Sequence, residues 1–281
     1  MLQDDSLLAD IRAAREAAEL HLWWLGQIGF LLQCDGRHLL VDPYLSDSLT
    51  AKYAATDKPH VRMTERVIAP ERLDFINVVA STHNHTDHFD PDTLGPLLAV
   101  NSELAIVVPA ANRAIAAERL GIAPDRLLTI DDGQTLEAGG FAITAVPAAH
   151  ETIERDEQGR LRFLGYLIGA GGLTVYHAGD TVLYDGMVER MGEHQIDVAL
   201  VPINGRDPSR RVAGNLWGRE AAWLARRIGA RLAIPCHYEM FEFNTASPDE
   251  FIAECKRLEQ RFRVLKAGER LTVERNEFRS T

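Results

Sequence analysis

Short apolar runs alternate with stretches of helical periodicity along most of the chain. Apolar residues from Leu7 to Ala18 recur at helical spacing and predict an amphipathic helix over residues 5–20. Runs of strand type, bounded by turn residues, predict strands over 21–25, 29–33, 38–41, 78–81, 104–108, 141–146, 163–168, 173–177, 198–201, 232–235 and 271–274. Helical patterns fall over 112–120, 219–228 and 248–262, and Asp90-Pro91 is typical of another helix start. Without a linker or repeat, these elements favour two tightly joined halves in one domain, residues 1–281.

Residues 46–70 interrupt this regular pattern. They lose periodicity, and Tyr53, His60 and Met63 are scattered among charged residues. A loop of this length inside a compact domain is usually either functional or mobile. We therefore expect a long excursion from the fold here.

Composition limits the classes of partner. The 281 residues include 30 lysines and arginines against 41 aspartates and glutamates, a formal net charge of −11, which argues against nucleic acid as a partner. The sequence has no apolar stretch near the ~20 residues that span a membrane, and its acidic start is unlike a signal peptide. Three cysteines at unrelated spacings indicate no disulfide framework. We expect a cytoplasmic protein without a membrane partner; the oligomeric state, a homo-oligomer included, stays open.

The candidate chemistry is concentrated in the segment Ser81-Thr-His-Asn-His-Thr-Asp-His-Phe-Asp90. A predicted strand leads into His83, His85 and Asp87, which alternate so that an extended chain would point them one way. His88 follows directly, before the predicted helix start. Imidazole and carboxylate groups this close together at the end of a strand are typical of a metal site.

Three further candidate ligands stand where predicted strands end. His150 follows the strand at 141–146, Asp180 follows the strand at 173–177, and His237 follows the strand at 232–235. Ligand sites in α/β proteins collect at strand ends, so we expect these side chains to join the first group.

The order Asp42, His83-x-His85-x-Asp87-His88, His150, Asp180 and His237 resembles the metallo-β-lactamase superfamily of metal-dependent hydrolases. Three local runs, 24–30, 201–207 and 235–245, are similar to the branch that includes L-ascorbate 6-phosphate lactonase. The resemblance covers residues 20 to 275 and implies an α/β (α+β) fold, a four-layer αββα sandwich with metals at one edge of the facing sheets.

The resemblance also implies two divalent metal ions and assigns their ligands. One ion would be held by His83, His85 and His150. The second ion would be held by Asp87, His88 and His237. Asp180 would bridge the two ions, and Asp42 would orient the ligand loop through hydrogen bonds without binding metal. A ligand set without thiolate suits Zn or Mn, and also Fe or Ni.

The reaction implied is hydrolysis by a metal-bound hydroxide, with Asp87 and Asp180 holding the nucleophile. The substrate would be a small ester or lactone, such as the phosphorylated sugar-acid lactone L-ascorbate 6-phosphate. A phosphodiesterase or nuclease of the same superfamily is the alternative, and cyclic nucleotides stay open as its substrates. A redox di-iron protein is a weaker rival, because the chain retains His85 and has no room for a flavin domain.

Substrate contacts are predicted from two loops. The first loop carries the candidates Asn204, Arg206, Arg210 and Arg211. These arginines would bind a phosphate or carboxylate of a small anionic substrate, or else pair with acidic side chains of the protein. The second loop carries Tyr238, Met240, Phe241, Phe243 and Asn244, which would line the pocket or pack in the core.

The remaining histidines are assigned structural roles. His177 would reach the ligand shell or, as the favoured alternative, bond to backbone. His21, His38, His60 and His194 have no neighbouring ligands in the sequence and are expected at the surface or in structural positions. Cys236 should point away from its neighbour His237 because strand side chains alternate.

Overall fold

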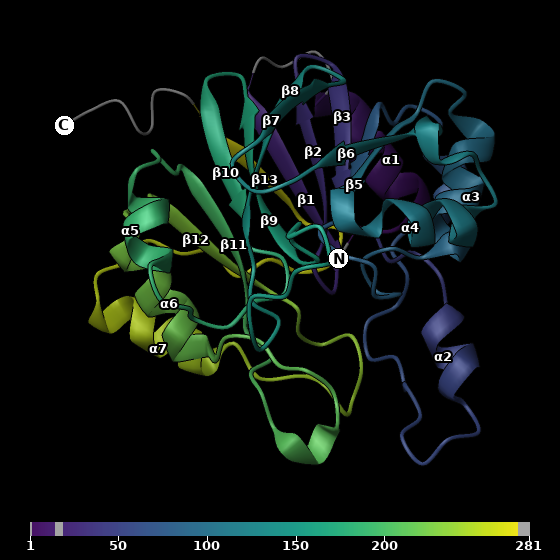
Figure 1. The fold of residues 1–281 in the computed structure, drawn as a ribbon. Helices are drawn as coiled ribbons and strands as arrows, with labels where there is room; N and C mark the ends of the chain where they lie inside the picture. The colour runs from purple at the N-terminus through teal and green to yellow at the C-terminus, as the bar shows by residue number, and fades with distance from the viewer. Residues whose placement is uncertain (1, 15–18, 275–281) are drawn as a thin grey trace.

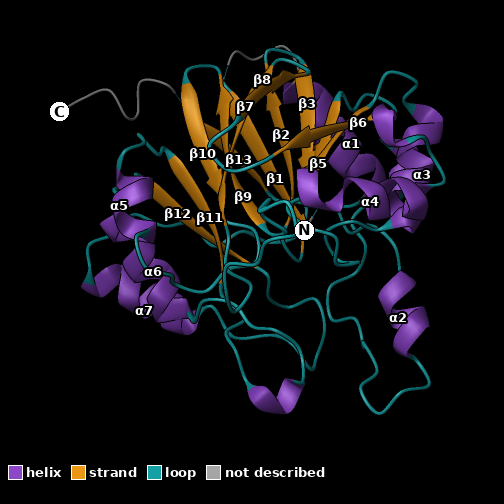
Figure 2. Ribbon diagram, viewed as in Figure 1, coloured by secondary structure: helices purple, strands orange, loops and turns teal. Residues whose placement is uncertain are grey.

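Two β-sheets lie face to face, with helices on both outer sides (Figures 1 and 2). The computed structural model describes residues 2–14 and 19–274. This arrangement confirms the predicted αββα sandwich.

The first sheet has the strand order β13-β1-β2-β3-β4-β5-β6. Its strands are β1 (Leu20–Gly26), β2 (Gly29–Cys34), β3 (Arg37–Val41), β4 (Val78–Ala80), β5 (Ala105–Pro109), β6 (Leu127–Ile130) and β13 (Arg270–Val273). The strands from β13 to β3 pair antiparallel, and those from β3 to β6 pair parallel.

The second sheet has the order β12-β11-β10-β9-β8-β7. Its strands are β7 (Thr135–Ala138), β8 (Phe141–Pro147), β9 (Leu164–Ala170), β10 (Leu173–His177), β11 (Val198–Pro202) and β12 (Leu232–Cys236). Here β7 to β10 pair antiparallel, whereas β10, β11 and β12 run parallel. In both sheets the parallel strands end at the same edge.

Strand β1 shows why the strands have nearly continuous apolar sequences. Leu22 and Trp24 pack in the core between the sheets, while Trp23 and Leu25 pack on the opposite side against the helices. A strand covered on both faces has no polar face, so its sequence is an apolar run instead of an alternation.

The helices form the outer layers. On the first sheet lie α1 (Asp4–Ala14), α3 (Pro91–Val100) and α4 (Arg113–Leu120); on the second lie α5 (Met187–Gly192), α6 (Gly218–Arg227) and α7 (Asp249–Arg257). The short helix α2 (Ser48–Tyr53) lies apart from both sheets, in the excursion, and short 3-10 turns cover 70–72, 110–112, 124–126 and 208–210. No helix in the described ranges is long and apolar enough to cross a membrane.

Two predicted helices differ from the prediction at their C-terminal ends. The prediction of a helix over 5–20 is wrong at its end, because Leu20 already pairs in β1; α1 is described over Asp4–Ala14, and residues 15–18 lie outside the described residues. Helix α7 ends at Arg257 instead of residue 262, and Glu259 takes a positive φ of 53° that no helix allows. The strands β6 and β7 were not predicted, because each is four residues long and partly exposed.

Gly179 makes the tight turn that follows β10. It has a φ of +62°, and an added Cβ would lie 2.5 Å from the carbonyl oxygen of Leu164 and 3.1 Å from Cβ of Thr82. Only glycine fits this backbone without strain or collision.

We therefore expect Gly179→Ala to lower the free energy of unfolding by about 2–4 kcal/mol, from left-handed strain and overpacking together. Gly192→Ala is the matched control, because nothing lies within 4 Å of its added Cβ. Urea denaturation followed by circular dichroism measures both. Equal stabilities for the two variants would contradict this account of the turn.

Candidate metal centre

The candidate ligands leave the sandwich at one edge, from the ends of four strands. β4 leads into the loop that carries His83, His85, Asp87 and His88, and β8, β10 and β12 lead to His150, Asp180 and His237. Groups far apart in the sequence meet here because β8, β10 and β12 run in the same direction in the second sheet, so that they end at one edge, where the loop after β4 of the first sheet joins them.

The ligand loop is a turn, and the expectation of an extended chain there is wrong. β4 stops at Ala80, and the backbone N–H groups of His88 and Phe89 both donate to the carbonyl oxygen of His85, at 3.0 and 2.7 Å. As a result, the loop's side chains divide between two groups: His83 and His85 meet His150, whereas Asp87 and His88 meet His237.

Each group brings together the ligand atoms that a metal ion would need. Within each trio the candidate atoms all lie within 4.8 Å of one another, and a third trio, His83, His88 and Asp180, joins the two groups. Oδ2 of Asp180 lies 3.4 Å from Nε2 of His88 and 3.3 Å from Nε2 of His237. It also lies 3.9 Å from Nε2 of His150, so Asp180 is between the groups.

Several of these atoms are buried without a hydrogen-bond partner. They include Nε2 of His83, Nε2 of His88 and Oδ1 of Asp180. Buried polar atoms are rarely left unsatisfied in native proteins, because each costs about 1–3 kcal/mol. The donor set of imidazoles and carboxylates therefore fits metal ions of the class expected from the sequence.

Asp42 lies directly behind the ligand loop, at the end of β3. Its fully buried carboxylate accepts hydrogen bonds from the backbone N–H of Thr82 at 2.7 Å and from the Thr82 hydroxyl at 2.6 Å. It also lies 2.8 Å from Nδ1 of His88. This third contact makes Nδ1 the donor and leaves Nε2 of His88 as the atom directed at Asp180.

The charge states of the imidazoles differ between the two groups. Burial lowers the pKa of His83 well below its usual value and that of His150 to about 4, so both stay neutral. Burial also disfavours the His237 cation, but Asp180 and Asp87 outweigh it and raise the pKa of His237 to about 9. A metal cation in the second group would take the place of these protons.

Gln27 is a member of the site that the sequence analysis did not identify. Its side-chain amide donates to Oδ2 of Asp87 at 2.8 Å and lies 3.3 Å from Nε2 of His237. Its backbone carbonyl accepts from the N–H of His237 at 2.7 Å. The available signal in the sequence was an amide side chain in the turn between two apolar strands. Such a side chain is buried here, and a buried amide needs a polar partner.

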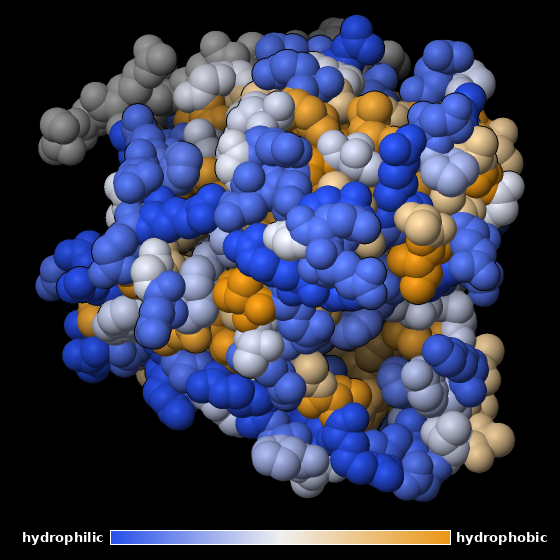
Figure 3. Space-filling view, in the orientation of Figure 1, coloured by the Kyte–Doolittle hydropathy of each residue, from blue (hydrophilic) through white to orange (hydrophobic). Residues whose placement is uncertain are grey.

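The candidate metal ligands lie beside a cavity of about 790 Å³. Its other walls come from α2 and the rest of the excursion and from the segment after β12, and Figure 3 shows apolar surface beside a hollow in the lower half of this face. The cavity is lined by Leu49, Lys52, Tyr53, His60, Asn84, Thr86, Arg119, Val212, Ala213, Phe241, Phe243 and Asn244, together with Gln27 and the ligand candidates His85, Asp87, His150, Asp180 and His237. The excursion is thus a pocket wall, and His60 belongs to it.

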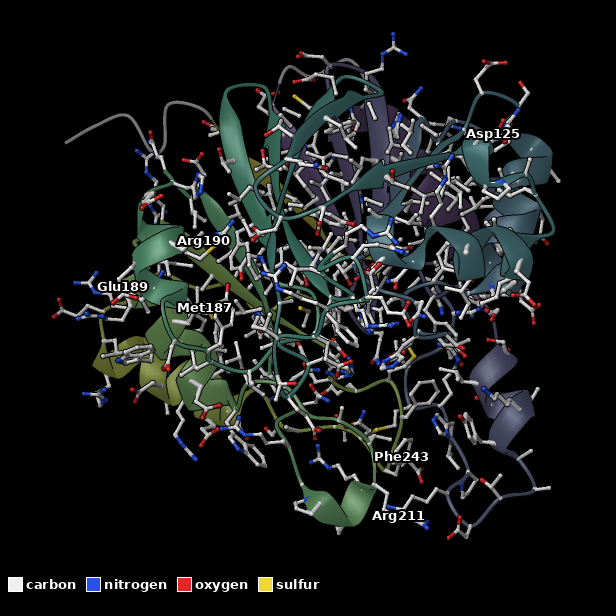
Figure 4. All side chains as sticks on the ribbon, in the orientation of Figure 1. Asp125, Met187, Glu189, Arg190, Arg211 and Phe243 are labelled. Atoms are coloured by element: carbon white, nitrogen blue, oxygen red, sulfur yellow. The ribbon has the colours of Figure 1, made fainter. Side chains whose placement is uncertain are left out.

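The loop that carries the candidate arginines reaches this cavity only through Val212 and Ala213; its predicted substrate contacts, Asn204, Arg206, Arg210 and Arg211, do not line it. Arg206 pairs with both carboxylate oxygens of Glu220, at 2.6 and 2.7 Å. Arg211 pairs with Asp57 at its outer tip (Figure 4), and Arg210 donates to carbonyl oxygens of Asn204 and Thr245. The role of these residues in substrate binding stays a prediction; the contacts give them a structural role.

The second loop divides between pocket and core. Phe241, Phe243 and Asn244 line the cavity, whereas Tyr238 is buried, stacks on Trp24 and donates to the carbonyl oxygen of Leu265. Met240 is likewise buried.

Two other residues have the structural roles favoured from the sequence. Nε2 of His177 lies 2.9 Å from the carbonyl oxygen of Ile28, which is the backbone role weighed above. Cys236 is fully buried, and burial raises the pKa of its thiol well above the usual value.

Comparison with known proteins identifies relatives along most of the chain. A family profile described as "Beta-lactamase superfamily domain" matches residues 37–238. A UPF0173 metal-dependent hydrolase from Methanoregula boonei is 31% identical over 83% of this chain and 88% of its own. Another, from Methanopyrus kandleri, is 30% identical over 85% and 93%. A possible metal-dependent hydrolase of Veillonella parvula has the same fold, with a TM-score of 0.73 at 18% identity over 92% of this chain and 100% of the other.

The fold, the ligand groups and the relatives together define a metal-dependent hydrolase. More narrowly, the chain belongs to the UPF0173 metal-dependent hydrolases of the metallo-β-lactamase superfamily. The superfamily resemblance is confirmed, and the narrower likeness to the lactonase branch stays a prediction.

Asp42→Asn should lower the affinity for Zn²⁺ roughly 10- to 100-fold, because an amide cannot accept all three hydrogen bonds that hold the ligand loop. Competition with a chromophoric chelator measures this affinity. The control is Asp197→Asn, which alters another buried carboxylate, bonded to the N–H of Thr174, outside the centre. Equal zinc affinities for the wild-type protein and Asp42→Asn would contradict the positioning role.

Proposed function

We propose that this hydrolase uses two divalent metal ions, Zn or Mn, to cleave a small ester or lactone that carries a negative charge. The observation that carries the proposal is the pair of ligand trios at one side of the cavity, with Asp180 between them. The three cysteines are buried and are not joined in disulfides, which supports a reducing cytoplasm as the compartment.

His83, His85 and His150 would hold one ion, Asp87, His88 and His237 the other, and Asp180 both. Bound ions of this kind lower the pKa of water toward neutrality and stabilise developing negative charge on the scissile carbonyl. The protein's own groups fix the geometry: Gln27 holds the carboxylate of Asp87, and Asp42 holds the imidazole of His88. Asp87 and Asp180 are the carboxylates available to accept a proton or hydrogen bond from the attacking water.

Direct attack by water is supported by the kinds of side chain that line the cavity. Among the described residues that line the cavity there is no serine or cysteine. Cys236 is adjacent to His237 in sequence, but its thiol is fully buried.

An anionic substrate is supported by the charges of the cavity. Outside the ligand set, its charged lining residues in the described part of the chain are both cationic, Lys52 and Arg119. Arg119 is held beside the ligand loop, where it donates to the carbonyl oxygen of Asn84 and to the Thr86 hydroxyl. Because the whole chain carries a formal net charge of −11, the two cationic residues in the cavity are a local exception that would attract an anionic substrate.

Metal analysis tests the ligand assignment. The metal-loaded protein should approach two equivalents per chain, and Asp180→Ala should lose most of this metal because both trios depend on that carboxylate. Asp185→Ala, an exposed aspartate five residues further along, should keep the full content. Full metal content in Asp180→Ala would exclude the bridging role.

Hydrolysis assays test the reaction itself. We expect the metal-loaded protein to cleave lactones and carboxylic esters at least 100-fold more efficiently, by kcat/KM, than phosphodiesters, and a chelator should abolish the activity. In ¹⁸O-labelled water, a single turnover should place the label in the product, because water attacks directly. A preference for phosphodiesters would replace the proposal with the phosphodiesterase alternative, and an unlabelled first product would mean that an enzyme oxygen attacks.

A further inference from the structure

Four aromatic side chains form a distinct part of the cavity, here called the aromatic bay: Tyr53, His60, Phe241 and Phe243. Tyr53 and His60 come from the excursion, and Phe241 and Phe243 come from the segment after β12. In Figure 4, Phe243 lies on the loops below the two sheets, between the arginine loop and α2. None of the four is a metal-ligand candidate in the described structure.

The rings of the bay are arranged around His60. Its ring stacks on Tyr53 with centroids 4.2 Å apart and planes at 16°, and it lies 4.4 Å from the ring of Phe243. Phe241 meets it edge-on at 5.1 Å. Tyr53, His60 and Phe243 are only half-buried, so ring surface stays open to the cavity.

The bay belongs to a small apolar cluster that is separate from the two main cores. Its partners there are Tyr44, Leu49 and Met240. Aromatic rings left open inside a cavity gain free energy when a ligand covers them, and they favour planar groups that stack or meet them edge-on. Their position therefore indicates ligand binding more than core packing.

Backbone pairing holds the bay together before any ligand binds. Val61 and Met63 bond to Glu242 and Met240 across the gap, at 3.0 and 2.8 Å. Arg62 adds a bond to Asp47 at 2.8 Å. A preorganised wall of this kind loses little conformational freedom on binding.

His60 also offers one defined polar atom. Its Nδ1 lies 3.2 Å from the carbonyl oxygen of Lys58, and because a carbonyl only accepts, Nδ1 carries the proton. In the neutral ring Nε2 is then a hydrogen-bond acceptor, and no described residue donates to it. Burial lowers the pKa of His60, which agrees with the neutral ring.

We propose that the aromatic bay binds a planar aromatic group of the substrate, which donates an N–H or O–H to Nε2 of His60. This inference rests on the proposed function, since it assigns the part of the substrate that is not cleaved. Contact with the open ring surface of Phe243 would provide affinity, and the hydrogen bond to His60 would select among aromatic groups.

Binding of three neutral probes to the zinc-loaded protein tests the proposal without turnover. Indole is planar and has an N–H donor, 1-methylindole is planar without a donor, and 2-cyclohexylethanol has a donor but no planar ring. Chemical-shift titration should give indole a Kd at least fivefold below that of either other probe.

Three variants test whether the aromatic bay causes these differences in Kd. His60→Phe keeps a ring without the acceptor, so indole and 1-methylindole should bind it equally. Phe243→Leu should weaken both indoles about fivefold. Trp223→Leu, which alters a half-exposed ring on α6, should change neither.

Equal binding of indole and 2-cyclohexylethanol to the wild-type protein would overturn the proposal. So would an unchanged preference for indole over 1-methylindole in His60→Phe. Thermal melting checks that each variant folds, and the wild-type comparison among the three probes stands whether or not a variant folds. A protein that prefers indole but cleaves no ester would overturn the proposed function and leave the bay intact.

Discussion

The buried carboxylate of Asp42 is the interaction on which the centre depends. A fully buried charge is costly unless every acceptor site is used, and Asp42 uses its oxygens on the Thr82 N–H, the Thr82 hydroxyl and Nδ1 of His88. These three bonds join the end of β3 to the ligand loop after β4. They set the position of the turn and the direction of the imidazole, so the protein's own contacts bring the two ligand trios together.

A second buried aspartate connects this loop to the wall of the cavity. Asp90 caps α3, and its carboxylate accepts hydrogen bonds from the hydroxyls of Ser46, Ser48 and Thr93. The ligand loop and the base of the excursion are therefore held by one carboxylate. The pocket wall that carries His60 is therefore held at both ends. Asp90 fixes one end relative to the candidate metal ligands, and backbone pairing with the segment after β12 fixes the other.

Much of the fold was predictable because the strands are buried on both faces and so stand out as apolar runs. The ligand candidates were predictable because His83, His85, Asp87 and His88 are close in sequence and the others follow strands. The pocket wall was not predictable. It depends on the pairing of two irregular segments far apart in the sequence, and such a pairing leaves no periodic pattern in the residues. The sequence left open whether Arg206 binds substrate or an acidic side chain of the protein, and it did not indicate that Gln27 reaches Asp87, because both contacts depend on the tertiary structure.

The central claim is that one preorganised set of side chains holds two ions that share Asp180. Anomalous diffraction from crystals of the zinc-loaded protein tests it most directly. The account predicts two peaks about 3.5–4 Å apart, one among His83, His85 and His150 and the other among Asp87, His88 and His237, with Asp180 between them. A single peak at saturating zinc, or peaks away from these residues, would contradict it.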